Sequence, residues 1–137
     1  MKFLCTKWRK LFMDDKPQLN LFNEMIEECS CEPLTGFFRT GCCDTSDQDL
    51  GSHTVCALMT EDFLKFSIAK GNDLSTPVPQ YNFPGLKEGD RWCLCANRWL
   101  EAYKSDSAPA IIAKATNLKA LDIIPMEIIK EFAIDIV

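Results

Sequence analysis

The pattern of apolar and polar positions predicts a domain of short strands and short helices from residue 20 onward. A short hairpin is expected in "LNLFNEMIEEC", with its turn at Asn23-Glu24. Runs of apolar and β-branched residues predict further strands in "HTVCALM" (residues 53–59), "RWCLCA" (91–96), "PAIIAKAT" (109–116) and "LDIIP" (121–125).

Helices are expected between and after these strands. The first is capped by Thr60 and ended by Gly71, and we expect Phe63, Leu64 and Ile68 on its buried side. The segments "NRWLEAYK" and "MEIIKEFAI" predict two more helices. Strands interspersed irregularly with short helices indicate a compact two-layer α+β domain with a short mixed or antiparallel sheet.

Two segments lack this alternation. Residues 71–90 contain three prolines and three glycines, and their apolar residues indicate a long ordered loop laid over the domain. Residues 1–19 form a basic amphipathic extension, in which residues 1–13 could contact a membrane surface weakly or pack on the protein's own acidic domain. We therefore expect an extension over residues 1–19 and a single globular domain over residues 20–137.

The charge of the chain excludes one class of partner. The formal charge is −5, but residues 14–137 carry 11 basic residues against 20 acidic ones. Such an acidic body repels phosphate backbones, so nucleic-acid binding is not expected. No apolar run approaches the roughly 20 residues that a transmembrane helix needs. A small molecule or a protein remains open as a partner.

The eight cysteines make the cellular compartment important. Basic residues interrupt "MKFLCTKWRKLFMDD" where a secretory signal needs an apolar run, so a cytoplasmic location is expected. Cysteines in a reducing cytosol are thiols, metal ligands or core residues rather than disulfides. No two cysteines are three residues apart, which argues against zinc ribbons and thioredoxin-type couples.

The alternation in "RWCLC" predicts two different strand faces. Cys93 and Cys95 would lie on one face, while Trp92 and Leu94 would lie on the other. The sulfurs could hold a soft metal or act as reactive thiols, but free cysteine is also a common buried apolar residue.

Several longer tracts resemble a known family. "TGFFRTGCC", "GSHTVCALMTEDFLKFS", "GNDLSTP" and "FPGLKEGDRWCLCANRWLEA" resemble, in order, an uncharacterised bacterial family, domain of unknown function 2237, over about residues 20–135. The resemblance implies a single compact α/β-type domain and brings no activity. Thr40 stands where the family usually has an acid, and Asn117 where it usually has a histidine. The cysteines that match cysteine positions of the family are Cys29, Cys43, Cys56, Cys93 and Cys95.

The candidate site residues follow from their chemistry. Because thiolates and imidazoles bind soft metals, the candidate ligands for zinc or another soft metal are Cys43, Cys56, Cys93, Cys95 and His53. A histidine close to a thiol can create a nucleophile, so the catalytic candidates are Cys43, His53 and Cys56. The candidates for binding a small ligand in a polar pocket are Arg39, Asp73, Tyr81, Asp90 and Arg91.

Two functions remain open at this point. The first is a thiol-centred site under the 71–90 loop that holds a soft metal or presents a reactive thiol. The second is a non-enzymatic module in which the cysteines are structural core and the loop binds a small molecule or a protein. A hydrolase or transferase that uses Asp73 or Asp90 with His53 rests on residue types alone. The sequence does not decide whether the protein is an enzyme.

Overall fold

The computed structural model describes residues 18–136. The expected basic extension falls almost entirely outside this range, and so does its predicted membrane contact. Among the described residues, no helix combines the length and the apolar character needed to cross a membrane.

A small antiparallel sheet lies at the centre of the fold. Strand β1 (His53–Leu58) is the middle strand, with β2 (Arg91–Cys95) on one side and β3 (Ala110–Ile111) on the other. The side chains of β1 and β2 alternate between two buried faces, because both faces of the sheet are covered. This arrangement confirms the predicted α+β class.

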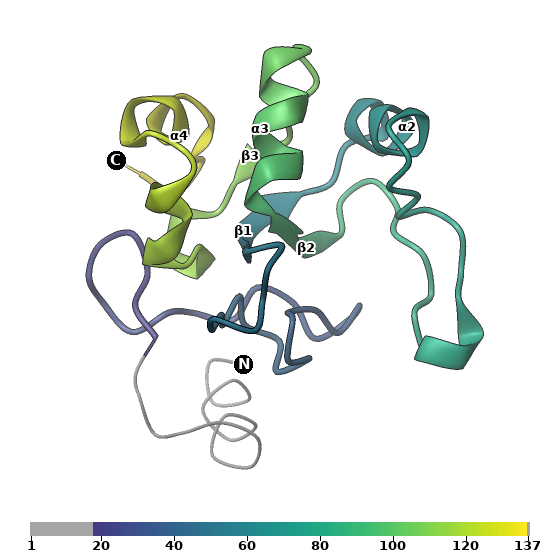
Figure 1. Cartoon of the computed structure of the whole chain (residues 1–137), viewed down its shortest axis with the longest axis horizontal. Helices are drawn as coiled ribbons and strands as arrows, with labels where there is room; N and C mark the ends of the chain where they lie inside the picture. Colours follow the sequence, from purple (N-terminus) through teal and green to yellow (C-terminus); the bar gives the residue numbers. More distant parts are fainter. Residues whose placement is uncertain (1–17, 137) are drawn as a thin grey trace.

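Three helices cover one face of the sheet: α2 (Glu61–Ala69), α3 (Ala96–Lys104) and α4 (Met126–Phe132) (Figure 1). The predicted cap of α2 is confirmed, because the Thr60 hydroxyl accepts the Phe63 N–H at 3.0 Å. The prediction that Ile68 is buried is wrong. Ser67 takes the buried position, and its hydroxyl donates to the Asn72 carbonyl at 2.5 Å.

The main apolar core lies between the sheet and these helices. Trp92 and Leu94 reach it from β2, as the alternation in the sequence predicts. Trp99 of α3 is fully buried, and its indole N–H donates to the Pro109 carbonyl at 3.0 Å. Its ring stacks on Tyr103 and meets Phe132 of α4 edge-on, at centroid distances of 5.8 and 5.1 Å.

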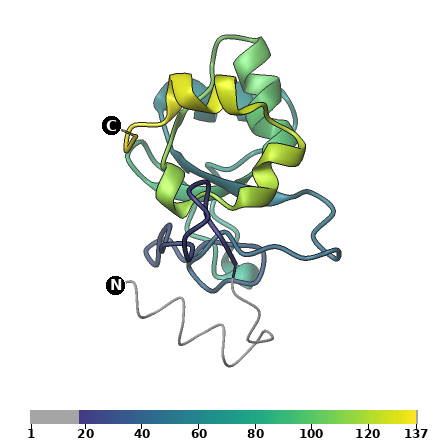
Figure 2. The same ribbon diagram turned by 90° about the vertical axis from the view of Figure 1, so that its left-hand side faces the viewer.

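The opposite face of the sheet is covered by residues 18–51, which we call the loop layer. Figures 1 and 2 show this segment across the sheet from the helices. It contains turns and isolated bridges but no helix or extended strand. The predicted hairpin is reduced to a turn with a single bridge between Leu19 and Met25. The buried Asn20 side chain holds this turn by accepting the N–H groups of Phe22 and Glu24 at 2.9 and 3.1 Å.

Residues 71–90 form an ordered loop, as predicted. A bridge between Val78 and Phe83 brackets a 3-10 helix, η1 (Pro79–Tyr81), and the Leu86 N–H donates to the Leu74 carbonyl at 2.8 Å. Leu74, Phe83 and Leu86 pack against the main core, and no residue of this loop belongs to the buried cluster that contains the disulfide cysteines. This loop therefore does not lie over the cysteines on the other face.

The C-terminal part differs from the prediction in two places. β3 is only two residues long, and the expected strand in "LDIIP" is absent: its first two residues end a 3-10 helix, η3 (Leu118–Asp122), and residues 123–125 form the turn that leads into α4. The Asn117 side chain caps η3 by accepting the Lys119 N–H at 2.9 Å. A short apolar run fits a buried strand and a buried helical turn equally well, so the cap residue decides. A second short 3-10 helix, η2 (Ala113–Ala115), follows β3.

Candidate functional site

Two cysteines of the central sheet face each other across β1 and β2. Cys56 and Cys93 are register partners. The Cys56 N–H donates to the Thr116 hydroxyl at 3.0 Å, and the Cys56 carbonyl accepts the Ile112 N–H at 2.9 Å, so both groups point away from β2. Cys56 and Cys93 therefore form a non-hydrogen-bonded pair, the kind in which opposed side chains lie closest. Both side chains lie on the face that the loop layer covers.

Two further cysteines come from the loop layer. The N–H of Cys29 donates to the Gly41 carbonyl at 2.8 Å, and the N–H of Gly41 donates to the Thr35 carbonyl at 3.0 Å. These bonds bring the Cys29 segment against the turn that precedes Cys43. The turn needs glycine at Gly36, which has a φ of +100° and no room for a Cβ beside the Cys42 carbonyl oxygen.

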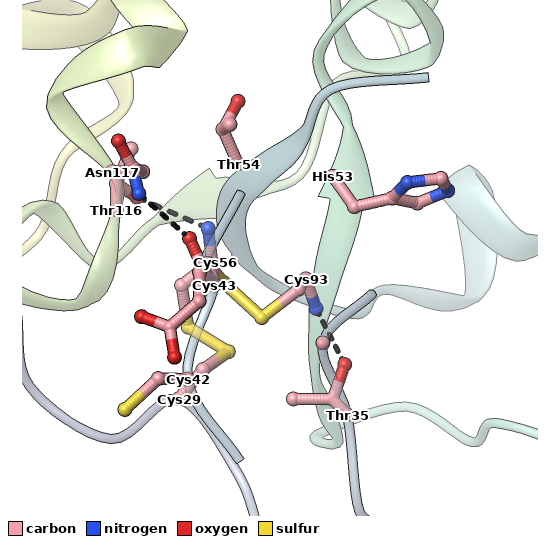
Figure 3. Close-up of a disulfide and its surroundings, with 12 residues drawn as sticks. Cys29, Thr35, Cys42, Cys43, His53, Thr54, Cys56, Cys93, Thr116 and Asn117 are labelled. Atoms are coloured by element: carbon pink, nitrogen blue, oxygen red, sulfur yellow. Dashed lines mark hydrogen bonds between the residues drawn. A yellow bond between two sulfur atoms is a disulfide. The ribbon is translucent and has the colours of Figure 1, made fainter. Parts of the chain in front are cut away.

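Each loop cysteine is bonded to one strand cysteine. The disulfides are Cys29–Cys56 and Cys43–Cys93, with Cα–Cα distances of 5.7 and 5.2 Å (Figure 3). The sulfurs of Cys29, Cys43 and Cys93 all lie within 4.8 Å of one another, so the two bonds are neighbours. The expectation that these cysteines are free thiols is wrong. We call the four residues the four-cysteine centre.

Buried side chains hold the backbone of this centre. The Thr35 hydroxyl accepts the Cys93 N–H at 2.8 Å, as the Thr116 hydroxyl does for Cys56. The Asn117 amide donates to the Cys43 carbonyl at 3.0 Å (Figure 3). Sequence analysis did not select Thr35 or Thr116 for this role. These threonines are 58 and 60 residues away in the sequence from the cysteines that they hold, so no local sequence signal points to them.

The centre is closed to solvent. Its cysteines are at most 4% exposed and pack with Ile26, Ile112 and Ala115. Its cover is the loop layer, so the prediction that the sulfurs lie under the 71–90 loop is wrong. Three converging sulfurs could hold a soft metal, but only after reduction, because thiolates are the metal ligands.

The other two metal candidates, Cys95 and His53, lie apart from the centre. They are register partners at the end of the β1–β2 pair, beyond an irregularity between His53 and Val55. The His53 ring points away from the sulfurs of the disulfides (Figure 3). Cys95 is a free thiol, and the three sulfurs that converge within 4.8 Å are those of Cys29, Cys43 and Cys93.

Cys31 is also a free thiol, but its surroundings keep it protonated. Burial, together with a hydrogen bond from its sulfur to the Glu28 carboxylate at 3.0 Å, raises the pKa of Cys31 to about 12. A thiol is a nucleophile only as the thiolate, so Cys31 is inert at neutral pH.

The residues expected to bind a ligand each make local contacts of their own. Arg39 donates to the Gly36 carbonyl and lies over the Trp92 ring at 5.2 Å, and burial lowers its pKa. The exposed Asp73 carboxylate accepts bonds from Thr76 and from the Ser75 N–H, which lower its pKa. The remaining three are Tyr81, which is exposed, Asp90, whose carboxylate accepts the Lys87 N–H, and Arg91, which is exposed.

The fold and the site define a class: a small α+β domain whose loop layer is joined to its sheet by two neighbouring disulfides. The chain belongs to the family described as an uncharacterised protein conserved in bacteria, domain of unknown function 2237, which it matches over residues 19–133. This match confirms the resemblance seen in the sequence. No curated protein matches the chain.

Proposed function

We propose that the protein is a thiol–disulfide redox-responsive domain in which the four-cysteine centre controls how the loop layer is held on the sheet. One observation carries this proposal: the Cys29–Cys56 and Cys43–Cys93 disulfides each join one cysteine of the loop layer to one cysteine of the sheet. The loop layer has no helix or extended strand of its own, so these cross-links are among its strongest attachments.

The chemistry is a two-electron exchange at each disulfide. A small dithiol supplies two electrons and two protons, closes to its own disulfide and leaves two cysteine thiols. Because the sulfurs are almost fully buried, the reductant reaches them only when the loop layer opens. This favours a responsive centre over an enzyme that exchanges disulfides with large substrates, since such an enzyme needs an accessible attacking sulfur.

The proposal is compatible with the cytoplasmic location expected from the sequence. Disulfides in reducing compartments are usually transient or redox-sensing, which is the behaviour that we propose. The alternative, a ligand-binding module, is not favoured, because the pocket at the end of the β1–β2 pair is lined by none of Arg39, Tyr81 and Arg91.

A redox titration of the purified protein tests the proposal. Mixtures of reduced and oxidised dithiothreitol set the redox state, free thiols are alkylated, and peptides are mapped by mass spectrometry. We expect Cys29–Cys56 and Cys43–Cys93 to convert reversibly to thiols, with a change in near-UV circular dichroism and a retained helical signal. A Cys31→Ser variant is the matched control and should titrate identically. Reduction without any spectroscopic change would contradict the proposal.

A second candidate function is soft-metal binding by the reduced centre. After reduction the Cys43 and Cys93 sulfurs would move apart and the Cys29 sulfur, now within 4.8 Å of both, would approach by up to roughly 1 Å to surround a zinc ion at about 2.3 Å, with Cys56 as the fourth ligand. Reduced protein kept free of oxygen should then bind one zinc ion per chain, and a Cys43→Ser variant should lose it while Cys31→Ser keeps it. Absence of stoichiometric zinc in the reduced protein would exclude this function.

A further inference from the structure

A histidine and a free thiol lie together at the end of the β1–β2 pair, away from the disulfides. His53 and Cys95 are opposed in register, and both line a pocket of about 190 Å³. The other lining residues are Asn72, Leu74, Trp92, Leu94 and Arg98. The walls are thus partly apolar, with a guanidinium and an amide among them.

The His53 ring is held in one orientation. Its Nδ1 lies 2.6 Å from Oδ1 of Asp49, whose side chain is fully buried. The second oxygen of Asp49 accepts the His53 backbone N–H at 2.8 Å and the Thr45 hydroxyl at 2.9 Å. A carboxylate at Nδ1 keeps the proton on that nitrogen and leaves Nε2 as the basic one.

Two neighbours fix the plane of the ring. It stacks on Phe37 at a centroid distance of 5.9 Å. On Gly51, an added Cβ would lie 2.8 Å from Cε1 of His53, so the ring rests directly against the glycine backbone. Such support on several sides is typical of an imidazole that is positioned for chemistry, and 38% of the His53 side chain remains exposed.

Cys95 has a different environment from Cys31. It ends β2 and is the N-cap residue of the nine-residue helix α3, where its sulfur makes no capping hydrogen bond. The first turn of a helix presents N–H groups without intrahelical partners, which can stabilise an oxyanion nearby. Cys31, in contrast, is engaged by Glu28.

We infer that Cys95 is the nucleophile of a second site, with His53 as its base and Asp49 as the residue that positions His53. The substrate class is a small activated acyl compound, an ester or a thioester, whose acyl group fits a pocket of this size. This inference does not depend on the redox function proposed above.

The reaction is an acyl transfer to sulfur. His53 Nε2 takes the proton of the Cys95 thiol, and the sulfur attacks the carbonyl carbon. A carbon–sulfur bond forms, and the bond from the carbonyl carbon to the leaving oxygen or sulfur breaks. The leaving group departs with the proton held by His53. An S-acyl cysteine and a free alcohol or thiol result.

Acetylation by p-nitrophenyl acetate tests the inference on the oxidised full-length protein. We expect a burst of one equivalent of p-nitrophenolate and an acetyl group on the peptide that contains Cys95. Cys95→Ser should abolish the burst, and Cys31→Ser, the matched control, should leave it unchanged. His53→Ala should slow the burst by about 10²-fold or more, and added imidazole should restore part of the rate.

The contribution of Asp49 and Gly51 to the orientation of His53 can be measured separately. Asp49→Asn and Gly51→Ala should lower the maximal burst rate without changing the half-saturating ester concentration, while near-UV circular dichroism confirms the fold. Acetylation of Cys31 as fast as that of Cys95, or a Cys95 rate that is unaffected by His53→Ala, would overturn the inference. A rate loss in His53→Ala that imidazole does not restore would also count against His53 as the base.

Discussion

Replacing both Cys43 and Cys93 by alanine should remove a large part of the stability of the oxidised protein. The two cysteines are 50 residues apart in the sequence. A cross-link over that separation restricts the unfolded chain by about 4 kcal/mol at 25 °C in the chain-entropy description. The loss of two buried sulfur atoms adds on the order of 1 kcal/mol each through the voids that remain. Small domains have only about 5–15 kcal/mol in total.

Urea unfolding followed by tryptophan fluorescence, in oxidising buffer and again with dithiothreitol, separates these two contributions. In oxidising buffer we expect the double variant to lose about 6 kcal/mol relative to the unsubstituted protein. With reductant, the cross-link term disappears from both proteins, and only the smaller difference caused by the voids should remain. Cys31→Ala, which removes a free thiol, is the matched control and should change stability little in either buffer.

Two results would refute this reasoning. One is a loss below about 1 kcal/mol in oxidising buffer, which would mean that the Cys43–Cys93 bond does not restrain the unfolded chain. The other is the same loss in both buffers, which would assign the whole effect to packing.

Three further predictions concern single side chains. Thr35→Val should destabilise the protein by about 1–3 kcal/mol, because the Cys93 N–H loses its buried acceptor, whereas Thr35→Ser should be nearly neutral. Urea unfolding measures both variants, and equal losses of stability would contradict the role of the hydroxyl. The rate of Cys31 alkylation should rise with pH up to about 12 rather than level off near 9, and Glu28→Gln should shift this pH profile to lower pH. A plateau near pH 9 in the unsubstituted protein would contradict the effect of burial and Glu28 on the pKa of Cys31. Reduction of the disulfides should slow the acetylation of Cys95, because Phe37, Asp49 and Gly51 hold the base from within the loop layer. The reductant is removed without oxygen before the ester is added, and an unchanged rate of acetylation of the Cys95 peptide would show that the two sites are independent.

The sequence predicted those parts of the fold in which local chemistry decides the structure. Thr60 and the acidic residues after it identified the start of α2, and the alternation in "RWCLC" separated the apolar face of β2 from its sulfur face. Both signals act over a few residues, so the rest of the fold could not override them. The segment "LDIIP" failed because its apolar pattern fits a strand and a 3-10 turn equally, and the Asn117 cap decided between them.

The site was predicted in part. Cys43, Cys56 and Cys93 converge as the first hypothesis requires, but their pairing partners depend on contacts between segments far apart in the chain. Cys29 was not a candidate, and it becomes one only when the bonds between its backbone and Gly41 are known. The role of Asp49 was missed for a related reason. A turn aspartate four residues before a histidine is common, and only the geometry shows its carboxylate on Nδ1 of His53.

Cys95 shows that the alternation of side chains between two strand faces does not hold at the end of a strand. Its position two residues after Cys93 predicts a sulfur on the same face and in the same site. However, β2 ends at Cys95 and α3 begins immediately after it, while the β1 register shifts beside it. The thiol is thereby separated from the four-cysteine centre and lines a pocket with His53 instead.

Amide hydrogen exchange, compared between the oxidised and the fully reduced protein, tests the central claim most directly. The account predicts that reduction greatly accelerates exchange in residues 18–51, which the disulfides join to the sheet, while the amides of α2, α3 and α4 keep their protection. An unchanged loop layer, or an equal loss of protection in the helices and the loop layer, would contradict the claim that the four-cysteine centre controls this layer.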